Sequence, residues 1–369
     1  MSWQKIIGQE RVKNILRSSI LQNRIAHSYL FYGDEGIGKD ALAIEFAKTL
    51  LCKEKQIEAC NKCVSCQQMN DLHHLAFQII NSTPSDSSEE SGKGKYFDEL
   101  QEQINLKSKN PYHKIQIAKA NFIRIETIRS IRYEAMQHLP NYKFRFYLVT
   151  NADEMNIEAS NSFLKILEEP NPSTIFLLTT SREDLLLPTI KSRCQHLQCE
   201  ILSDDQIAHA LIEKNNLPLE QAKLISKISR GSFRRAQELL TEDFNSERED
   251  VVNFIRSIVT KNPLELTTQI EKLCEDYERV DIERILNLLQ LWLRDSIMVR
   301  EGVFEEVVNF DQQDSLERFV AKFGNTNLNE TISIIDRSLE LLKKNVYLPL
   351  VLYFTSIELR KIFIYAEKN

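Results

Sequence analysis

The stretch that decides the fold is SYLFYGDEGIGKD, residues 28–40. Residues 28–32 form a short apolar run, a glycine-rich turn follows, and residues 41–51 show helical periodicity. This order predicts a strand, a phosphate-binding turn of the form G-x4-G-K, and a helix. In such a turn backbone N–H groups face a phosphate, and Lys39 would neutralise the phosphate oxygens. The glycines of the predicted turn are Gly33, Gly36 and Gly38.

The residue after Lys39 departs from this pattern. Ser or Thr normally stands there and holds magnesium through its hydroxyl, whereas this chain has Asp40. A carboxylate can ligate magnesium, but it also places negative charge beside the phosphates and takes up the helix dipole. We therefore expect the shape of a phosphate loop without efficient hydrolysis.

A second departure follows the strand predicted at 144–150. An ATPase of this kind carries an Asp-Glu pair at that strand end, where this chain has Asn151 and Ala152. Asp153 and Glu154 come two residues late, and we interpret them as the acidic start of a helix. Binding of ATP and Mg²⁺ by this chain is therefore an open question.

Four cysteines lie close together behind the predicted helix. Cys52, Cys60, Cys63 and Cys66 have the spacing C-x7-C-x2-C-x2-C. Four thiolates suit Zn²⁺, and a closed shell of four protein ligands is typical of a structural site. The alternative is a set of unligated thiols or a redox pair. The other cysteines, Cys194, Cys199 and Cys274, are isolated and are predicted to be core thiols.

Strands and helices alternate through the first part of the chain, which predicts an α/β fold with a doubly wound parallel sheet ending near Glu200. Strands are expected at 75–80, 144–150, 174–180 and around Leu197, and helices at 125–135 and 156–169. Residues 81–109 are rich in Ser, Glu, Lys and Gly, and we expect a solvated, mobile insertion there.

Only helical patterns follow Glu200. Ser203, with Asp204 and Asp205 behind it, is a predicted helix cap, and a small helical unit extends to about Leu240. Residues 241–250 are polar and are predicted to be a linker. Four or five amphipathic helices are expected from there to Asn369.

Composition places the chain among soluble globular proteins. It has 369 residues, of which 42% are hydrophobic and 27% charged, and its length suits two or three domains. A net charge of −6 gives no general attraction to nucleic acid. The start has no apolar signal region, and the longest apolar run, residues 346–354, is about half a membrane span. We expect a cytoplasmic protein, in which cysteines bind metal or stay reduced.

One basic residue has the position of a catalytic group. Arg193 follows the strand predicted at 174–180, on the rim of the sheet, too far to reach its own phosphate turn. Such a guanidinium could project into a neighbouring subunit and stabilise charge on a transferred phosphoryl group. A surface arginine in a salt bridge is the alternative, and the residues do not decide between them.

Several of these stretches together resemble the clamp-loader subunits of bacterial DNA polymerase III, which belong to the AAA+ family. The matching segments are IGQE at 7–10, IAHSYLF at 25–31, the cysteine quartet, NSFLKILEEP at 161–170, SRC at 192–194 and GSFRRA at 231–236. The match is specific over residues 1–240 and weak beyond them, where residues 345–359 resemble the last helix of the family's collar domain.

This resemblance implies an AAA+ domain at 1–200 with a zinc module at about 51–70, a helical lid at 201–245 and an all-α collar for oligomerisation at 250–369. It is greatest to the delta prime type of subunit, which is largely non-hydrolysing. Arg193 would then act in trans on the ATP of the adjacent subunit. Gly33, Gly36, Gly38, Lys39, Asp40 and Arg234 would form a degenerate nucleotide site.

The implied partners are the ATPase subunits and the clamp-opening delta subunit, with the sliding clamp and primed DNA reached through the complex; no membrane partner is expected. The alternative within the family is the ATP-hydrolysing gamma/tau-type motor subunit, using Lys39, Asp40 and Arg234. A third hypothesis is another AAA+ factor such as a Holliday-junction motor. That class needs a working nucleotide pocket and lacks a zinc insert.

Overall fold

The computed structural model of the chain describes residues 2–54, 57–84, 90–137, 139, 141–240, 244–260, 262–344 and 346–365. They form two compact units, Met1–Glu238 and Leu239–Asn369, and each unit is described by itself. Among the described residues, no helix has both the length and the apolar character needed to cross a bilayer.

The first unit is built on a five-stranded sheet in the order β2-β5-β6-β1-β7, with every neighbouring pair parallel. The strands are β1 (Ser28–Tyr32), β2 (Phe77–Ile80), β5 (Arg145–Val149), β6 (Thr174–Thr180) and β7 (Gln195–Gln198). Leu30 pairs with Leu178 on one side and with His196 on the other, so β1 is an interior strand. The predicted parallel α/β sheet is confirmed.

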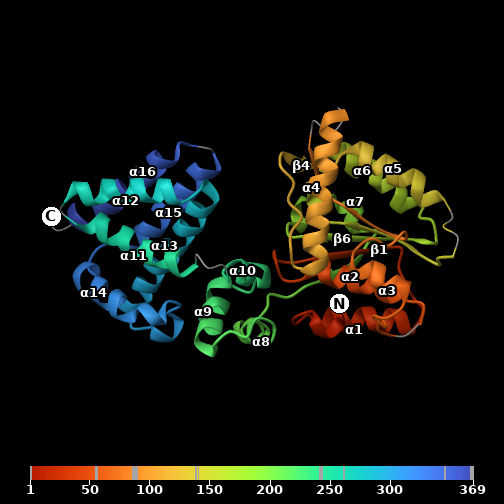
Figure 1. The fold of residues 1–369 in the computed structure, drawn as a ribbon, viewed down its shortest axis with the longest axis horizontal. Helices are drawn as coiled ribbons and strands as arrows, with labels where there is room; N and C mark the ends of the chain where they lie inside the picture. The colour runs from red at the N-terminus through yellow and green to blue at the C-terminus, as the bar shows by residue number, and fades with distance from the viewer. Residues whose placement is uncertain are drawn as a thin grey trace. The chain divides into compact units, whose positions relative to one another are not determined.

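Helices cover both faces of this sheet (Figure 1). Helices α1 (Glu10–Leu21), α2 (Lys39–Leu51) and α3 (Val64–Asn70) lie on one side, and α5 (Ile125–Met136), α6 (Ile157–Glu168) and α7 (Pro188–Lys191) on the other. Side chains alternate between the two faces along each strand. Tyr29 and Phe31 therefore enter the core under α1 and α2, whereas Leu30 enters the core under α5 and α6.

The predicted mobile insertion at 81–109 is wrong for residues 90–109. They form helix α4 (Glu90–Lys109), and β3 (Thr83–Pro84) pairs with β4 (Ala120–Phe122) beside it. Among the described side chains of this helix, those of 97, 98, 101, 102, 105, 106 and 109 are exposed, but Lys107 near its end is buried. Residues 85–89 of the insertion lie outside the described residues.

Three helices complete the first unit, namely α8 (Asp204–Asn215), α9 (Leu219–Ser229) and α10 (Phe233–Glu238). The predicted cap at Ser203 is confirmed. The Ser203 hydroxyl accepts a hydrogen bond from the Gln206 N–H at 3.2 Å, and the Gln206 side chain accepts one from the Ser203 N–H at 3.0 Å. This reciprocal pair is a capping box and fixes where α8 begins.

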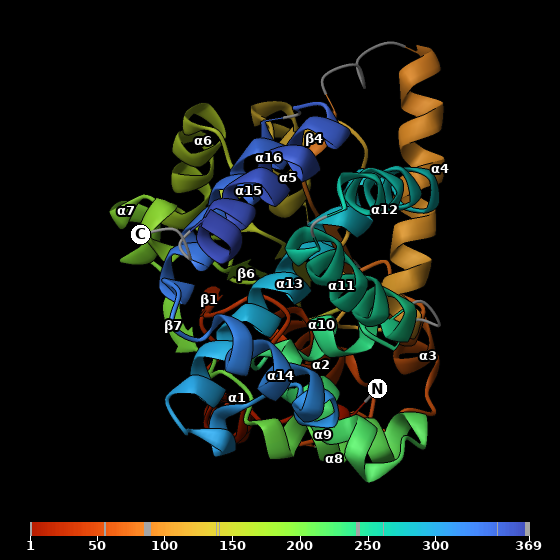
Figure 2. The same ribbon diagram turned by 90° about the vertical axis from the view of Figure 1, so that its left-hand side faces the viewer.

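The second unit is helical throughout its described residues (Figure 2). Its α-helices are α11 (Phe244–Val259), α12 (Pro263–Asp276), α13 (Arg279–Arg300), α14 (Gln313–Phe323), α15 (Leu328–Lys343) and α16 (Leu348–Arg360), one more than the upper expectation of five. α15 and α16 pack side by side, and the Thr355 hydroxyl donates to that of Ser338 at 2.8 Å.

Short 3-10 turns occur in both units. Those of the first unit are η1 (Trp3–Lys5), η3 (Ala152–Glu154) and η4 (Glu183–Leu185). Those of the second unit are η5 (Phe304–Glu306) and η6 (Phe310–Gln312), and η7 (Lys361–Tyr365) of the same unit is a π turn.

The predicted linker at 241–250 is wrong for residues 244–250, which form the first part of α11. Three of the four charged residues there, Glu247, Arg248 and Asp250, are buried and ion-paired. Buried Glu247 accepts from Arg284 at 2.6 Å, and buried Arg248 donates to Asp311 at 2.7 Å. Charge in this stretch therefore stabilises a helix, and residues 241–243 lie outside the described part of the chain.

Candidate functional site

The glycine-rich turn connects β1 to α2, as the sequence predicts. Gly33, Gly36 and Gly38 have φ angles of +138°, +78° and +102°, which L side chains rarely adopt. A Cβ atom at Gly36 would lie 2.0 Å from the Ser232 hydroxyl, just before α10. Position 36 therefore needs glycine also because the start of α10 packs against it. The turn is thus held against both the sheet and the small helical group α8–α10.

Lys39 is directed back onto its own turn. Its ammonium donates to the carbonyl oxygens of Gly33 at 2.8 Å and Asp34 at 2.5 Å, and to the Ser181 hydroxyl at 3.0 Å. An ammonium has three protons, so these bonds use its whole donor capacity. Burial lowers the pKa of Lys39 below its ordinary value. A phosphate would reach this ammonium only by breaking existing bonds.

Asp40 is also fully engaged. One carboxylate oxygen accepts from the Thr179 hydroxyl at 2.7 Å, and the other accepts from the buried ammonium of Lys107 at 2.6 Å. Burial opposes the charged form of Asp40, but Lys107 and Thr179 outweigh it and hold the pKa of Asp40 below its ordinary value. Lys107 therefore binds the carboxylate oxygen that a metal ion would need, and a metal ion would have to displace it.

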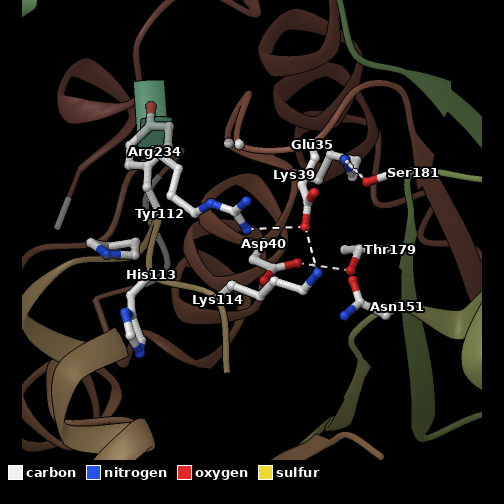
Figure 3. A pocket seen from close by; sticks show the side chains of 13 residues that line it. Glu35, Lys39, Asp40, Tyr112, His113, Lys114, Asn151, Thr179, Ser181 and Arg234 are labelled. Carbon is white, nitrogen blue, oxygen red and sulfur yellow. Dashed lines mark hydrogen bonds and ion pairs between the residues drawn. The ribbon is translucent and has the colours of Figure 1, made fainter. Parts of the chain in front are cut away.

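A second charge cluster lies at the mouth of the turn (Figure 3). Glu35 accepts from Lys114 at 2.5 Å and from Arg234 of α10 at 3.0 Å. Burial opposes ionisation of Glu35, yet these two cations lower its pKa to about 2. In Figure 3 Glu35, Asp40, Lys114, Thr179 and Arg234 lie around one small space, and the cavity lined by the labelled residues has a volume of about 40 Å³.

The end of β5 brings no acid into this space. Asn151 lines the cavity with φ +48°, and Ala152 is buried. Asp153 belongs to the turn η3, where one oxygen accepts from the Thr180 hydroxyl at 2.6 Å and the other from Arg182 at 2.7 Å. The acidic pair thus begins a helical turn, as predicted, and its first carboxylate is already bonded.

The cysteine cluster lies at the opposite end of α2. The Sγ atoms of Cys52, Cys60, Cys63 and Cys66 all lie within 4.8 Å of one another. The Sγ atoms of Cys60 and Cys66 are 3.8 Å apart, and the edge of a tetrahedron with Zn–S bonds of ~2.3 Å is about 3.8 Å long. Four convergent thiols at this spacing could hold a metal and suit Zn²⁺.

Local backbone bonds support thiolate character in the cluster. The N–H of Cys60 donates to Sγ of Cys52 at 3.4 Å, and the N–H of Cys63 donates to Sγ of Cys60 at 3.4 Å. The N–H of Cys66 donates to Sγ of Cys63 at 3.5 Å. These donors favour the charged sulfur that a metal requires. The buried ammonium of Lys48 donates to Asn70 at 2.7 Å and also to Asn61, which anchors the turn that carries Cys60 and Cys63.

Arg193 lies between α7 and β7 and forms a salt bridge within its own chain. Its guanidinium donates to Glu168 at the end of α6 at 2.9 Å and to the Thr189 carbonyl at 3.0 Å. Both side chains of the ion pair are partly exposed, at 34% and 50%. An exposed pair of this kind is worth only about 0–1 kcal/mol, so a stronger external anion could displace Glu168.

The sequence prediction missed several residues of the nucleotide-site corner. Thr179 lies near the end of β6, which adjoins β1, and Ser181 directly follows that strand. The rule that parallel strand ends meet at one sheet edge could have identified both residues. Lys107 comes from the segment predicted to be mobile, and Tyr112 and Lys114 follow shortly after it. No local pattern reveals them, because Lys107 and Asp40 are 67 positions apart.

With the geometry in place, comparison with known proteins identifies the family. The family model described as "DNA polymerase III, delta subunit" matches residues 8–203, and the one described as "DNA polymerase III, delta subunit, C terminal" matches residues 242–357. The chain belongs to this DNA polymerase III delta subunit family.

Individual relatives agree with that assignment. The chain is 25% identical over 349 residues to DNA polymerase III subunit delta' of Bacillus subtilis, covering 94% of both chains. It is 29% identical over 239 residues to subunit delta' of Pseudomonas aeruginosa, covering 63% of this chain and 62% of that one. Subunit tau of Bacillus subtilis is 26% identical over 246 residues, covering 65% of this chain but only 37% of tau. The resemblance to the delta prime type is confirmed, and it fits better than the gamma/tau alternative.

Proposed function

We propose that the chain is a clamp-loader subunit of the bacterial replicative DNA polymerase III, acting in the cytoplasm as a largely non-hydrolysing member of an AAA+ ring. The observation that carries the proposal is the state of its own phosphate turn. Lys39 bonds to the turn itself and Asp40 bonds to Lys107, while Asn151 and Ala152 supply no carboxylate. A pocket in this state lacks both a free phosphate ligand and a base or metal ligand for water attack.

The catalytic contribution would come from Arg193 and act on a neighbour. Its guanidinium is partly exposed, its ion pair with Glu168 is solvent-accessible, and it lies on the rim of the sheet after α7. A displaceable arginine of this kind suits transition-state stabilisation in an adjacent ATPase subunit. The tau relative, which aligns with this chain over 37% of its own length, is our candidate for that neighbour.

The other partners follow from the same assembly. We propose that the chain contacts the delta subunit and the ATPase subunits, and that it reaches the sliding clamp and primed DNA through them. The cysteine cluster would hold one structural Zn²⁺ that orders the region around α3. ATP with Mg²⁺ would have no stable place in this subunit.

The test is reconstitution with Arg193→Ala. The assembled loader should retain its composition, measured by gel filtration, but lose at least tenfold of its DNA-stimulated ATP hydrolysis, the magnitude typical of an arginine finger being ~10³ or more. Arg182→Ala is the matched control, since Arg182 is also an ion-paired arginine near a strand end. Normal clamp loading by the Arg193 variant would show that this role is wrong.

A further inference from the structure

We propose that residues 107–114 act as a built-in occupant of the nucleotide cleft: the chain binds its own segment where a nucleotide would lie, and this contact fixes α8–α10 against the phosphate turn without any nucleotide. The inference rests on the proposed function, in which the nucleotide cleft is idle, and names residues 107–114 as the group that fills this cleft. The segment is the end of α4 together with the residues that follow it.

The aromatic part of this occupant is Tyr112. Its side chain is buried, with 7% exposed, and its ring lies so close to the turn that a Cβ atom at Gly38 would be 2.9 Å from Cε1 of the ring. The hydroxyl accepts from the Ile7 N–H at 2.9 Å. On its other side the ring packs edge-on against Phe233 of α10, with centroids 4.9 Å apart. A flat ring thus fills the space between the chain start, the turn and the helical group.

The charged part consists of two lysines that neutralise the acids of the turn. Lys107 is 1% exposed and donates both to Asp40 and to the His113 carbonyl, each at 2.6 Å. Lys114 forms an ion pair with Glu35, and Glu35 forms a second ion pair with Arg234. Glu35 therefore gives Arg234 the negative partner that a phosphate would give it, and Lys107 gives Asp40 the cation that a metal ion would supply. The cluster is electrostatically satisfied without a ligand.

The same segment connects the sheet to the helical group. The Asn110 amide donates to the Gln237 side chain of α10 at 3.0 Å. The Lys214 ammonium of α8 lies 5.7 Å from the Tyr112 ring and 5.0 Å from the Phe233 ring. These contacts link α4, the turn, α8 and α10 in one packed arrangement. A bound nucleotide normally makes such a connection only while it is present, whereas here it is part of the chain.

The remaining volume agrees with occupancy. The cavity of about 40 Å³ has room for water but not for a nucleotide, since ligand pockets measure about 300–1,000 Å³. Ligand binding would have to expel Tyr112 and break the pair of Asp40 with Lys107. Both steps lose contacts made by Tyr112 or Lys107 of the segment, so substitution of these two residues should open the cleft.

The test is binding of MgADP by isothermal titration calorimetry to an opened variant, Asp40→Thr/Lys107→Met/Tyr112→Ala. This triple change removes the buried ion pair as a unit, leaves no unpaired charge and vacates the ring position. We expect no binding heat from the unaltered chain, and an apparent affinity at least ~10-fold tighter in the opened variant, a change of about 1.4 kcal/mol. The matched control is Lys109→Met/Tyr133→Ala, which changes the same residue types at exposed positions on α4 and α5.

Two outcomes would overturn the inference. One is an opened variant that is folded, with unchanged far-ultraviolet circular dichroism, and binds MgADP no better than the control. The other is tight MgADP binding by the unaltered chain. If the opened variant fails to fold, hydrogen exchange of the unaltered chain decides: the Ile7 amide and residues 107–114 should keep the same protection with and without millimolar MgADP, and loss of protection would contradict occupancy.

This experiment separates the inference from the proposed function. An opened variant that fails to bind leaves the role of Arg193 in the assembled loader untouched. The opened variant should also bind without hydrolysing, because Asn151 and Ala152 still supply no carboxylate. Failure of the Arg193 reconstitution would, in turn, say nothing about what fills the cleft.

Discussion

The two ends of helix α2 carry two sites built in opposite ways. At its start the side chains of the phosphate turn bond to one another and to α4, leaving a cavity of about 40 Å³. At its end four thiols converge within 4.8 Å, and the neighbouring ammonium of Lys48 is already hydrogen-bonded to Asn61 and Asn70. The first site is closed by side chains of the chain itself, whereas the second has the geometry to hold a metal ion.

The comparison teaches that a motif is defined by where its donors and acceptors are directed. Lys39 has the residue type and spacing of a phosphate ligand, yet its protons point to backbone carbonyls of the turn and to Ser181. The cysteines have both the spacing and the geometry. Residue type alone therefore predicts the metal site better than the nucleotide site.

The largest expected effect is at the metal end. Cys60→Ser should abolish binding of one Zn²⁺ per chain and lower the free energy of unfolding by more than about 4 kcal/mol, because a metal site stabilises the folded state alone. Inductively coupled plasma mass spectrometry and thermal melting measure the two quantities. Cys274→Ser, at an isolated thiol, is the control and should retain the metal. A metal-free chain with an unchanged melting temperature would break the comparison.

The next effect is at the nucleotide end. Lys107→Met leaves the carboxylate of Asp40, whose side chain is 23% exposed, without its cation, and should cost up to about 3–5 kcal/mol in urea unfolding. The double variant Asp40→Asn/Lys107→Met should recover most of that loss, because no unpaired charge remains. Lys109→Met, on the exposed surface of the same helix, is the control. A Lys107 variant as stable as this control would mean that the ion pair does not hold the cleft closed.

A smaller effect comes from Glu45, in the middle of α2. Neither carboxylate oxygen has a hydrogen-bond partner, and burial raises the pKa of Glu45 to about 7, opposed by Lys48 at 3.9 Å. The folded state therefore holds this proton up to a higher pH than the unfolded state, so the contribution to stability is present at low pH and declines as pH rises from about 4.5 towards 7.

Glu45→Gln should remove this decline and be more stable than the unaltered chain at pH 8, by roughly 2–3 kcal/mol. Urea unfolding at pH 5 and pH 8 measures it, with exposed Glu10→Gln as the reference. Equal pH dependence of the two variants would contradict the raised pKa.

The smallest expected effect on stability is at Arg193. Since its pair with Glu168 is exposed, Arg193→Ala should change the free energy of unfolding by less than about 1 kcal/mol. Thermal melting measures this change. A larger loss would indicate that the arginine is a structural residue, and would weaken its assignment to a neighbouring subunit.

Much of the fold could be predicted from the sequence because its signals are local. Residues 28–40 contain the strand, the turn and the helix start, and buried parallel strands such as Thr174–Thr180 are continuous apolar runs. Residues 244–250 and α4 were misjudged for a shared reason. Buried charges in both are paired with residues distant in the chain, as Glu247 is with Arg284 and Lys107 with Asp40, and a local window sees only polarity.

The candidate site divides in the same way. The absence of an acid at Asn151, the substitution at Asp40 and the cysteine spacing are all visible in single stretches of sequence. The occupancy of the cleft is not, because it depends on a lysine near the end of α4 and on a tyrosine and a second lysine that follow this helix. A long-range ion pair leaves no periodic signal, so only the folded chain shows it.

The most direct measurement for this account is steady-state ATP hydrolysis with Mg²⁺ by the isolated chain, compared with its Lys39→Ala variant. If the cleft does not hydrolyse ATP, both proteins should show the same rate of ATP hydrolysis, equal to the background rate in buffer without protein. Turnover by the unaltered chain that disappears in the Lys39 variant would contradict it, since Lys39 would then be binding phosphate rather than its own turn.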